Sequence, residues 1–204
     1  MRIGSIHLRI ILNSTYMDIV SQIKEAVRGL LLQGNLNESV ANDFLERIKY
    51  KKLSIDDNPV SHFCAYFAPY NKITKKVFLG HHKKSGLWLF NGGHVDKGES
   101  LRQSLKREIN EEWGLNADDF EIKELAMLTI TDIYNPEKQP CRKHFDLWNF
   151  LDVSEKEFNP DKEKLEEEFY EAGWKDLNEA RGLMGHNNKQ TLEAINFVED
   201  KYFK

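Results

Sequence analysis

The sequence predicts an α/β fold: a mixed sheet with helices packed on it, preceded by an N-terminal helical hairpin. Apolar residues recur at helical spacing over most of the first 52 residues. After Pro59 the spacing changes to alternate residues, which is typical of strands, and short strand-like runs then mix with two further helical segments. The chain has 204 residues, 40% of them hydrophobic, which is enough to bury one good-sized core.

The first expected unit is a hairpin of two helices within residues 15–52. Gly34 interrupts the helical pattern, and a second amphipathic segment follows at residues 39–50. We therefore predict two parts, a hairpin extension over residues 1–55 and the main domain over residues 56–204. The apolar faces of the hairpin need burial, and dimerisation, a cover over the site and packing on the sheet are all compatible with that need.

The strands of the main domain are expected in the following order. Strands at residues 62–67 and 76–79 flank a turn predicted at residues 69–71, and a third short strand at 88–90 ends at the Asn91-Gly92-Gly93 sequence. Later strands are expected near residues 120–130, 144–151 and 169–174, and a final helix at 189–202.

The helix expected at residues 100–113 has clear start and stop signals. Ser100 and Gln103 form a capping-box pattern at its start, and Gly114 suits the left-handed position that ends a helix. At about 100° per residue, the buried stripe consists of Leu101, Leu105, Ile109 and Trp113.

Two glutamates of this helix, Glu108 and Glu112, fall within the apolar stripe, whereas a solvated acidic face would lie opposite it. They also lie near the helix C-terminus, where the helix dipole disfavours negative charge. Clustered, partly buried carboxylates repel one another unless a cation compensates, and oxygen ligands suit Mg²⁺ or Mn²⁺. The placement favours a metal site over a solvated surface.

The segment from Gly93 to Leu115 resembles the Nudix box, Gly-x5-Glu-x7-Arg-Glu-aliphatic-x-Glu-Glu-x-Gly-aliphatic, at all nine defining positions. Seven of these positions require one residue type, so a chance match is on the order of one in 10⁸ to 10⁹ per start position. The residue before Gly92 is often proline in this family, whereas here it is Asn91. The resemblance implies a Nudix α/β/α sandwich and hydrolysis of the diphosphate linkage of a nucleoside diphosphate derivative.

The resemblance also implies roles for individual residues. Mg²⁺ or Mn²⁺ would be held by Glu108, Glu111 and Glu112, with the carbonyl of Gly93, or alternatively of Gly92, as a further ligand. Glu108 and Glu111 are alternative candidates for orienting or deprotonating the attacking water. Arg107 would orient a glutamate by a charge-assisted hydrogen bond and Glu99 would anchor the loop to the helix. A glutamate from a later segment is the base in some members, and the candidates here are Glu163, Glu166, Glu167 and Glu168.

Residues outside the box would have to recognise the substrate. His94, His144 and Lys84 are candidates for phosphate contact, against the alternative of solvent-exposed strand ends and turns. Trp88, Phe90, Tyr134 and Trp148 could stack on a base, although aromatic residues in strands are more often part of the core.

Composition limits the function classes. The net charge of −4 argues against a dedicated nucleic-acid surface, and no stretch has the roughly 20 apolar residues of a membrane span. Cys64 and Cys141 are expected to be reduced thiols in a cytoplasmic protein, and a homodimer is compatible with the sequence. The expected partner is a small nucleotide-type substrate: a nucleoside triphosphate, ADP-ribose or another nucleotide sugar, or a dinucleoside polyphosphate. The alternative is a non-catalytic Nudix-type domain that senses nucleotides.

Overall fold

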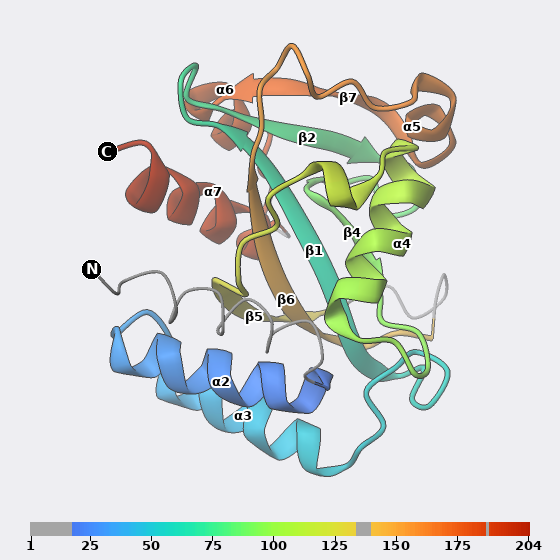
Figure 1. The fold of residues 1–204 in the computed structure, drawn as a ribbon, viewed down its shortest axis with the longest axis vertical. Helices are drawn as coiled ribbons and strands as arrows, with labels where there is room; N and C mark the ends of the chain where they lie inside the picture. The colour runs from blue at the N-terminus through green and yellow to red at the C-terminus, as the bar shows by residue number, and fades with distance from the viewer. Residues whose placement is uncertain (1–17, 134–139, 187) are drawn as a thin grey trace, which may run out of the picture.

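The computed structural model describes residues 18–133, 140–186 and 188–204, and it contains the predicted hairpin (Figure 1). Helix α2 (Ile19–Leu32) begins at Asp18, whose side chain accepts a hydrogen bond from the backbone of Ser21, and α3 (Glu38–Lys49) begins at Asn37 in the same manner. Both caps satisfy backbone N–H groups that have no partner inside the helix.

The sheet has seven strands within the described residues. Its order is β3-β2-β1-β6-β5, while β4 pairs with β1 and β7 pairs with β2. Strands β1 and β6 run parallel at the centre and the other pairings between described strands are antiparallel, so the predicted mixed sheet is confirmed (Figure 1). The strands are β1 (Ser61–Asn71), β2 (Lys76–His82), β3 (Trp88–Leu89), β4 (Asn91–His94), β5 (Met127–Asp132), β6 (Lys143–Asp152) and β7 (Phe169–Asp176).

The turn predicted at residues 69–71 was wrong, because β1 continues through Pro69 to Asn71. Proline is tolerated there because its missing N–H lies where the ladder is interrupted. On one side Pro69 is paired with Leu151 of β6. On the other side the pairing of β1 with β4 reaches only Phe67, and its pairing with β2 begins only at Tyr70. The chain reverses after Asn71, whose side-chain oxygen accepts hydrogen bonds from the backbone of Ile73 and Thr74.

Other boundaries also differ from expectation. Asn91–His94 forms strand β4 against β1 instead of a loop, and the strand expected near residues 120–130 begins only at Met127. Three short elements had no sequence signal that we recognised: the 3₁₀ turn Ala117–Asp119, α5 (Lys162–Glu168) and α6 (Leu177–Gly182). The final helix α7 (Lys189–Tyr202) has the predicted bounds.

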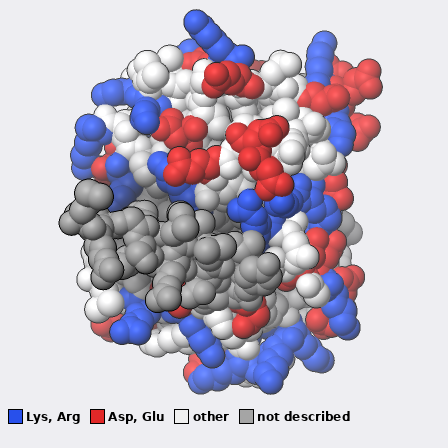
Figure 2. Space-filling model, in the orientation of Figure 1, with Lys and Arg blue, Asp and Glu red and all other residues white. Residues whose placement is uncertain are grey.

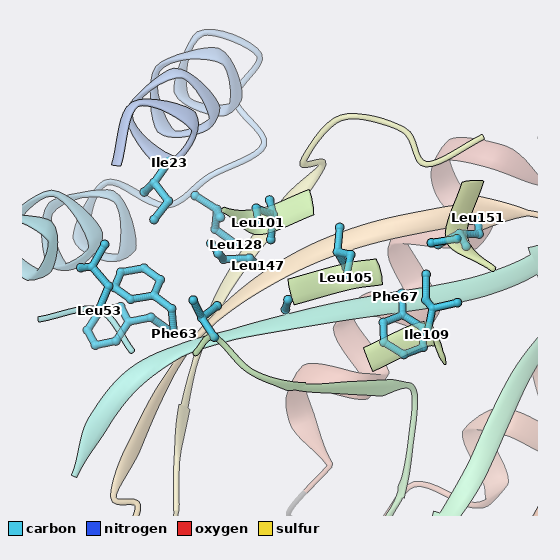
Figure 3. Packing of buried hydrophobic residues seen from close by; sticks show 14 of the residues in the cluster. Ile23, Leu53, Phe63, Phe67, Leu101, Leu105, Ile109, Leu128, Leu147 and Leu151 are labelled. Carbon is cyan, nitrogen blue, oxygen red and sulfur yellow. The ribbon is translucent and has the colours of Figure 1, made fainter. Parts of the chain in front are cut away.

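Alternate residues of β1 and β6 point to opposite faces of the sheet, and each face has its own core. Phe63, Phe67 and Leu147 pack with the hairpin and with α4 (Leu101–Trp113) in the larger cluster (Figure 3). Tyr70, Trp148 and Phe150 pack on the other face with residues of α7. The result is a sheet between helical layers, which confirms the predicted fold class (Figure 1).

No described helix is long and apolar enough to cross a membrane. Acidic and basic side chains are interspersed on the described part of the face in Figure 2, without a continuous basic stripe.

Candidate active site

Helix α4 has the start, the end and the buried stripe that the sequence predicts. The side chain of Ser100 accepts from the backbone of Gln103, and Gln103 returns a bond to the backbone of Ser100, which completes the capping box. Gly114 adopts the left-handed conformation at φ 66°. The predicted stripe of Leu101, Leu105, Ile109 and Trp113 is buried.

The Glu108 carboxylate is buried against the backbone of β4. Glu108 is only 7% exposed, and a Cβ atom added to Gly93 would overlap its carboxylate. Glycine at position 93 is therefore required by the close approach of backbone and carboxylate, not by its φ angle. The Gly93 backbone and the Glu108 oxygens therefore lie side by side.

Glu112 lies beside Glu108 along the same helix face and is partly buried. The side-chain amide of Asn91 donates to Glu112 Oε2 at 2.7 Å, and the Gly92 backbone also bonds to this carboxylate. Asn91 itself is fully buried, and its Oδ1 atom has no hydrogen-bond partner among the described residues. The position that often holds proline in similar sequences thus supplies a donor to a box glutamate.

Arg107 connects the glutamates through its five N–H donors. It binds both oxygens of Glu99 at 2.8 and 2.9 Å, which is the bidentate geometry that guanidinium groups favour. It also donates to Glu108 at 2.6 Å, to Glu111 at 3.1 Å and to the carbonyl of His94 at 2.8 Å. One side chain therefore joins the loop, the helix and strand β4.

Burial and hydrogen bonding shift the pKa values of these carboxyl groups in opposite directions. Burial raises the pKa of Glu108 to about 7 and raises the pKa of Glu112 well above its ordinary value. The hydrogen bonds from Arg107 lower the pKa of Glu99. Glu99 is thus stable as an anion, while Glu108 and Glu112 need further positive charge to stay ionised at neutral pH.

The candidates for a later general base all lie on the exposed α5. Glu166 forms an ion pair with Lys162 at 3.4 Å. Glu168, at the end of α5, lies 3.7 Å from His82, and its charge contributes to the raised pKa of Glu112. Among the four candidates, Glu168 is the one that the electrostatics connect to the box glutamates.

The residues predicted to bind substrate do not form one cluster. Lys84 is exposed in the turn between β2 and β3. Trp88 on β3 is partly buried, stacks on His81 with ring centroids 5.4 Å apart, and lies 5.0 Å from the ammonium of Lys175. Phe90 and Trp148 are core residues, as the more common fate of strand aromatics predicts, and Tyr134 lies outside the described residues.

His94 and His144, the other two predicted phosphate contacts, instead lie in a cluster with His62 and Cys64. Burial lowers the pKa of His94 to about 4 and that of His144 to about 3, so both imidazoles are neutral at neutral pH. The cluster has no local sequence pattern because its members come from three strands. Its one sequence signal is the two-residue spacing of His62 and Cys64, which places both on one face of β1.

Comparison with known proteins agrees with the box. The NUDIX domain profile matches residues 63–195, more than half of the chain. The fold is similar to the dihydroneopterin triphosphate pyrophosphohydrolase of E. coli (TM-score 0.55, 18% identity, 69% of this chain and 94% of that one). It is also similar to a MutT protein from Methanosarcina mazei Go1 (TM-score 0.50, 17% identity, 70% and 96%). No curated protein sequence matches the chain. On the intact box, its geometry and this profile, the chain belongs to the NUDIX domain family.

Proposed function

We propose that this chain is a divalent-metal-dependent hydrolase that cleaves the diphosphate linkage of a nucleoside diphosphate derivative. The observation that carries the proposal is that Glu108 is buried against the Gly93 backbone while the partly buried Glu112 is hydrogen-bonded to Asn91 and the Gly92 backbone. Buried carboxylates are costly without a compensating charge, and Arg107 is shared among three glutamates. A protein that needed only a stable helix would not require them there.

The donor set fits a hard divalent cation such as Mg²⁺ or Mn²⁺. Glu108, Glu111 and Glu112 and the Gly93 carbonyl would hold the ion, since all are oxygen ligands. The raised pKa values of Glu108 and Glu112 fit a site whose carboxylates are ionised only when a cation is present. When bound, the ion would neutralise charge on the diphosphate and lower the pKa of a bound water.

The other residues would organise this reaction. Arg107 fixes the directions of Glu108 and Glu111, and Glu99 fixes Arg107 by its bidentate pair. Asn91 and the Gly92 backbone fix the carboxylate of Glu112 by hydrogen bonds, which orients it as a ligand. We propose Glu168 as the base that accepts a proton from the attacking water, because its charge is felt at Glu112 and its side chain is accessible to solvent.

The substrate class rests on the family and on the chemistry of the site. We propose nucleoside triphosphates (oxidised ones included), ADP-ribose and other nucleotide sugars, and dinucleoside polyphosphates as candidates. The similar E. coli protein is named for a pterin triphosphate substrate. Pterin and purine triphosphates therefore belong in the panel of compounds to be tested. The two buried, free cysteines support a reducing, cytoplasmic location.

The proposal is tested by incubating the chain with this panel plus Mg²⁺ or Mn²⁺ and measuring released phosphate products. We expect metal-dependent cleavage of at least one compound at a phosphoric anhydride bond, and no cleavage with excess chelator. Tight nucleotide binding without turnover on any compound would instead support the sensor alternative and contradict the enzyme proposal.

A further inference from the structure

We propose that His62, Cys64, His94 and His144 form a second metal site, for a zinc-like transition-metal ion, that is separate from the glutamates. One ligand atom from each of these four residues lies within 4.8 Å of the ligand atoms of the other three. The proposal does not depend on whether the chain hydrolyses diphosphates.

Strand pairing brings the four residues together. His62 and Cys64 are two residues apart and therefore lie on one face of β1. On one side His62 is the partner of His144 in β6, and on the other Cys64 is the partner of His94 in β4. The three imidazole rings have centroid separations of 4.5, 4.9 and 5.2 Å. A rigid, three-strand scaffold thus holds all four ligands.

The hydrogen bonds of the cluster orient its ligand atoms, and the contacts that an ion would replace are weak ones from Cys141 Sγ to Nε2 of His62 at 3.6 Å and of His94 at 4.0 Å. His62 Nδ1 lies 3.0 Å from the Asn58 carbonyl, which can only accept, so Nδ1 carries the proton and Nε2 carries the lone pair. Metal-binding histidines usually show this arrangement, in which the second nitrogen donates to a carbonyl or carboxylate. His144 is 8% exposed, and its Nε2 has no hydrogen-bond partner among the described residues.

Three imidazole nitrogens and one thiolate are donors that zinc-like ions prefer and Mg²⁺ does not. With metal–nitrogen distances of about 2.0–2.1 Å and a metal–sulfur distance of about 2.3 Å, tetrahedral ligands lie roughly 3.3–3.6 Å apart. The observed upper limit of 4.8 Å requires the side chains to close by roughly 1 Å, which rotamer adjustments can supply.

The charge around the cluster also suits a divalent ion. Asp146 is the partner of Cys64 across β1 and β6 and is completely buried. One of its oxygens binds Thr129 and Thr131 at 2.9 and 2.6 Å, while the other has no partner within the described chain. Burial raises the pKa of both Cys64 and Asp146, so a Cys64 thiolate and an ionised Asp146 would balance two positive charges only when the ion is bound. Three positive charges oppose the ion from outside the cluster: Arg47 acts on His62, Arg107 on His94, and the exposed Lys84 on His94 and His144.

The second site would lie on the other face of β4 from the glutamates. Gly93 faces Glu108, while the next residue, His94, faces the cluster, and Arg107 donates to the His94 carbonyl. An ion with four protein ligands leaves no open position, which is typical of structural metal sites. We infer that it would fix the β4 backbone that presents Gly93 to the glutamates.

Cobalt(II) is the probe for this site, because a thiolate ligand gives it a charge-transfer absorption that carboxylates do not. Metal-stripped full-length protein is titrated with Co²⁺ in excess Mg²⁺, which occupies the carboxylates. We expect one Co²⁺ per chain with the thiolate band, and competition by Zn²⁺. No thiolate band in the wild type would overturn the proposal.

Matched variants assign the ligands. Cys64→Ser should abolish the band and Cys141→Ser should keep it, although Cys141 Sγ lies only 3.6 Å from His62 Nε2. The reverse pattern would contradict Cys64 as the ligand. His144→Ala should weaken Zn²⁺ binding more than about 100-fold, whereas His186→Ala, at an exposed position, should leave it unchanged.

Thermal unfolding gives an independent readout. Zn²⁺ should raise the melting temperature of the stripped wild type and of His186→Ala, but not that of His144→Ala, because an ion that binds only the folded state stabilises it. An equal rise in all three proteins would place Zn²⁺ elsewhere and overturn the assignment.

Discussion

Asn91 holds a box glutamate by a contact that a proline could not make. Its amide donates to Glu112 at 2.7 Å from a fully buried position. For this single residue, the contact, together with the bond from the Gly92 backbone, fixes the direction of the Glu112 carboxylate. Asn91 is therefore a positioning residue for the proposed reaction.

Asn91→Ala should lower kcat about tenfold with little change in KM, because a hydrogen bond to a charged group contributes about 1.5–3 kcal/mol and part of this orientation is lost. A second expected sign is a higher Mg²⁺ concentration for half-maximal rate. Steady-state kinetics over a Mg²⁺ series measure both.

The matched control is Asn149→Ala. Asn149 is also buried in the sheet, and its amide donates to the Lys123 carbonyl at 2.9 Å, away from the glutamates. The Asn149→Ala protein should have a lower unfolding free energy than the wild type but the same Mg²⁺ dependence of its rate. Equal kinetic effects of the two substitutions would show that Asn91 acts only through stability.

The pair formed by Glu99 and Arg107 should make stability depend on pH in a defined direction. Because the hydrogen bonds from Arg107 lower the folded-state pKa of Glu99, its contribution is present above the unfolded value of about 4.3. The contribution is lost as the pH falls through the folded-state pKa. The wild type should therefore exceed Glu99→Gln in unfolding free energy at pH 6, and the difference should shrink towards pH 3.

Urea unfolding of both proteins between pH 6 and pH 3 measures this difference, with the exposed Glu193→Gln as the surface control. A gap between wild type and Glu99→Gln that widens on acidification would show that the ion pair does not stabilise the folded state.

The sequence predicted those site residues that are related within one helix, and not those that meet across two elements. Glu108 and Glu112 could be placed because helical periodicity relates residues four apart within one element. The contact from Asn91 to Glu112 joins residues 21 positions apart on a strand and a helix, so no local pattern contains it. The phosphate contacts predicted for His94 and His144 stay predictions, and the proposed second metal gives both histidines another role.

Among the elements, helix α4 has its first and last residues fixed by its two caps. Gly114 has φ 66°, and a Cβ there would also lie 2.8 Å from Asp161 Cβ. Gly29 lies inside α2 with open space around it. The same substitution should therefore have opposite effects at the two positions.

Gly114→Ala should lower the unfolding free energy by about 1–2 kcal/mol, because a side chain is strained in the left-handed conformation. Gly29→Ala should raise it by about 0.5–1 kcal/mol, because alanine favours the helix interior. Equilibrium urea unfolding checks both values. An unchanged unfolding free energy in Gly114→Ala would show that the left-handed conformation of residue 114 does not stabilise α4.

Helices with a clear apolar periodicity of their own were predicted well, and strand boundaries less well. Helices α4 and α7 carry their own periodicity and match within a residue. By contrast, β1 passes through a proline because of an interruption in its neighbours, and β4 forms only because β1 is available to pair. Where these strands begin and end depends on the partner strand, which the local sequence does not reveal.

At the scale of the whole molecule, the hairpin belongs to the same core as the sheet. Phe44 of α3 makes edge contacts with Phe63 of β1 and Phe145 of β6, at centroid distances of 5.8 and 5.2 Å. Ile23 of α2 joins the same cluster (Figure 3). Of the three uses considered for its apolar faces, packing on the sheet is confirmed. The division near residue 55 into a hairpin extension and a main domain stays a proposal. Because the two parts share one core, we expect them to unfold together.

Phe44→Ala should lower the unfolding free energy of the whole chain by about 3–5 kcal/mol, in one cooperative transition, because it opens a cavity between hairpin and sheet. Leu32→Ala, at a position 79% exposed, should change it by less than about 0.5 kcal/mol. Tryptophan fluorescence and far-ultraviolet circular dichroism during urea unfolding should coincide. Two separate transitions would show that hairpin and sheet fold independently.

We propose above all that Glu108 and Glu112 bind a divalent cation that drives diphosphate hydrolysis. The most direct test of this proposal is the Mg²⁺-dependent rate of wild type, Glu112→Gln and the exposed control Glu193→Gln on the best substrate of the panel. We predict that Glu112→Gln lowers kcat at least about 100-fold while its unfolding midpoint stays at or above that of the wild type, and that the control retains full activity. Near-normal, Mg²⁺-dependent turnover by Glu112→Gln would remove Glu112 from the site and contradict the account.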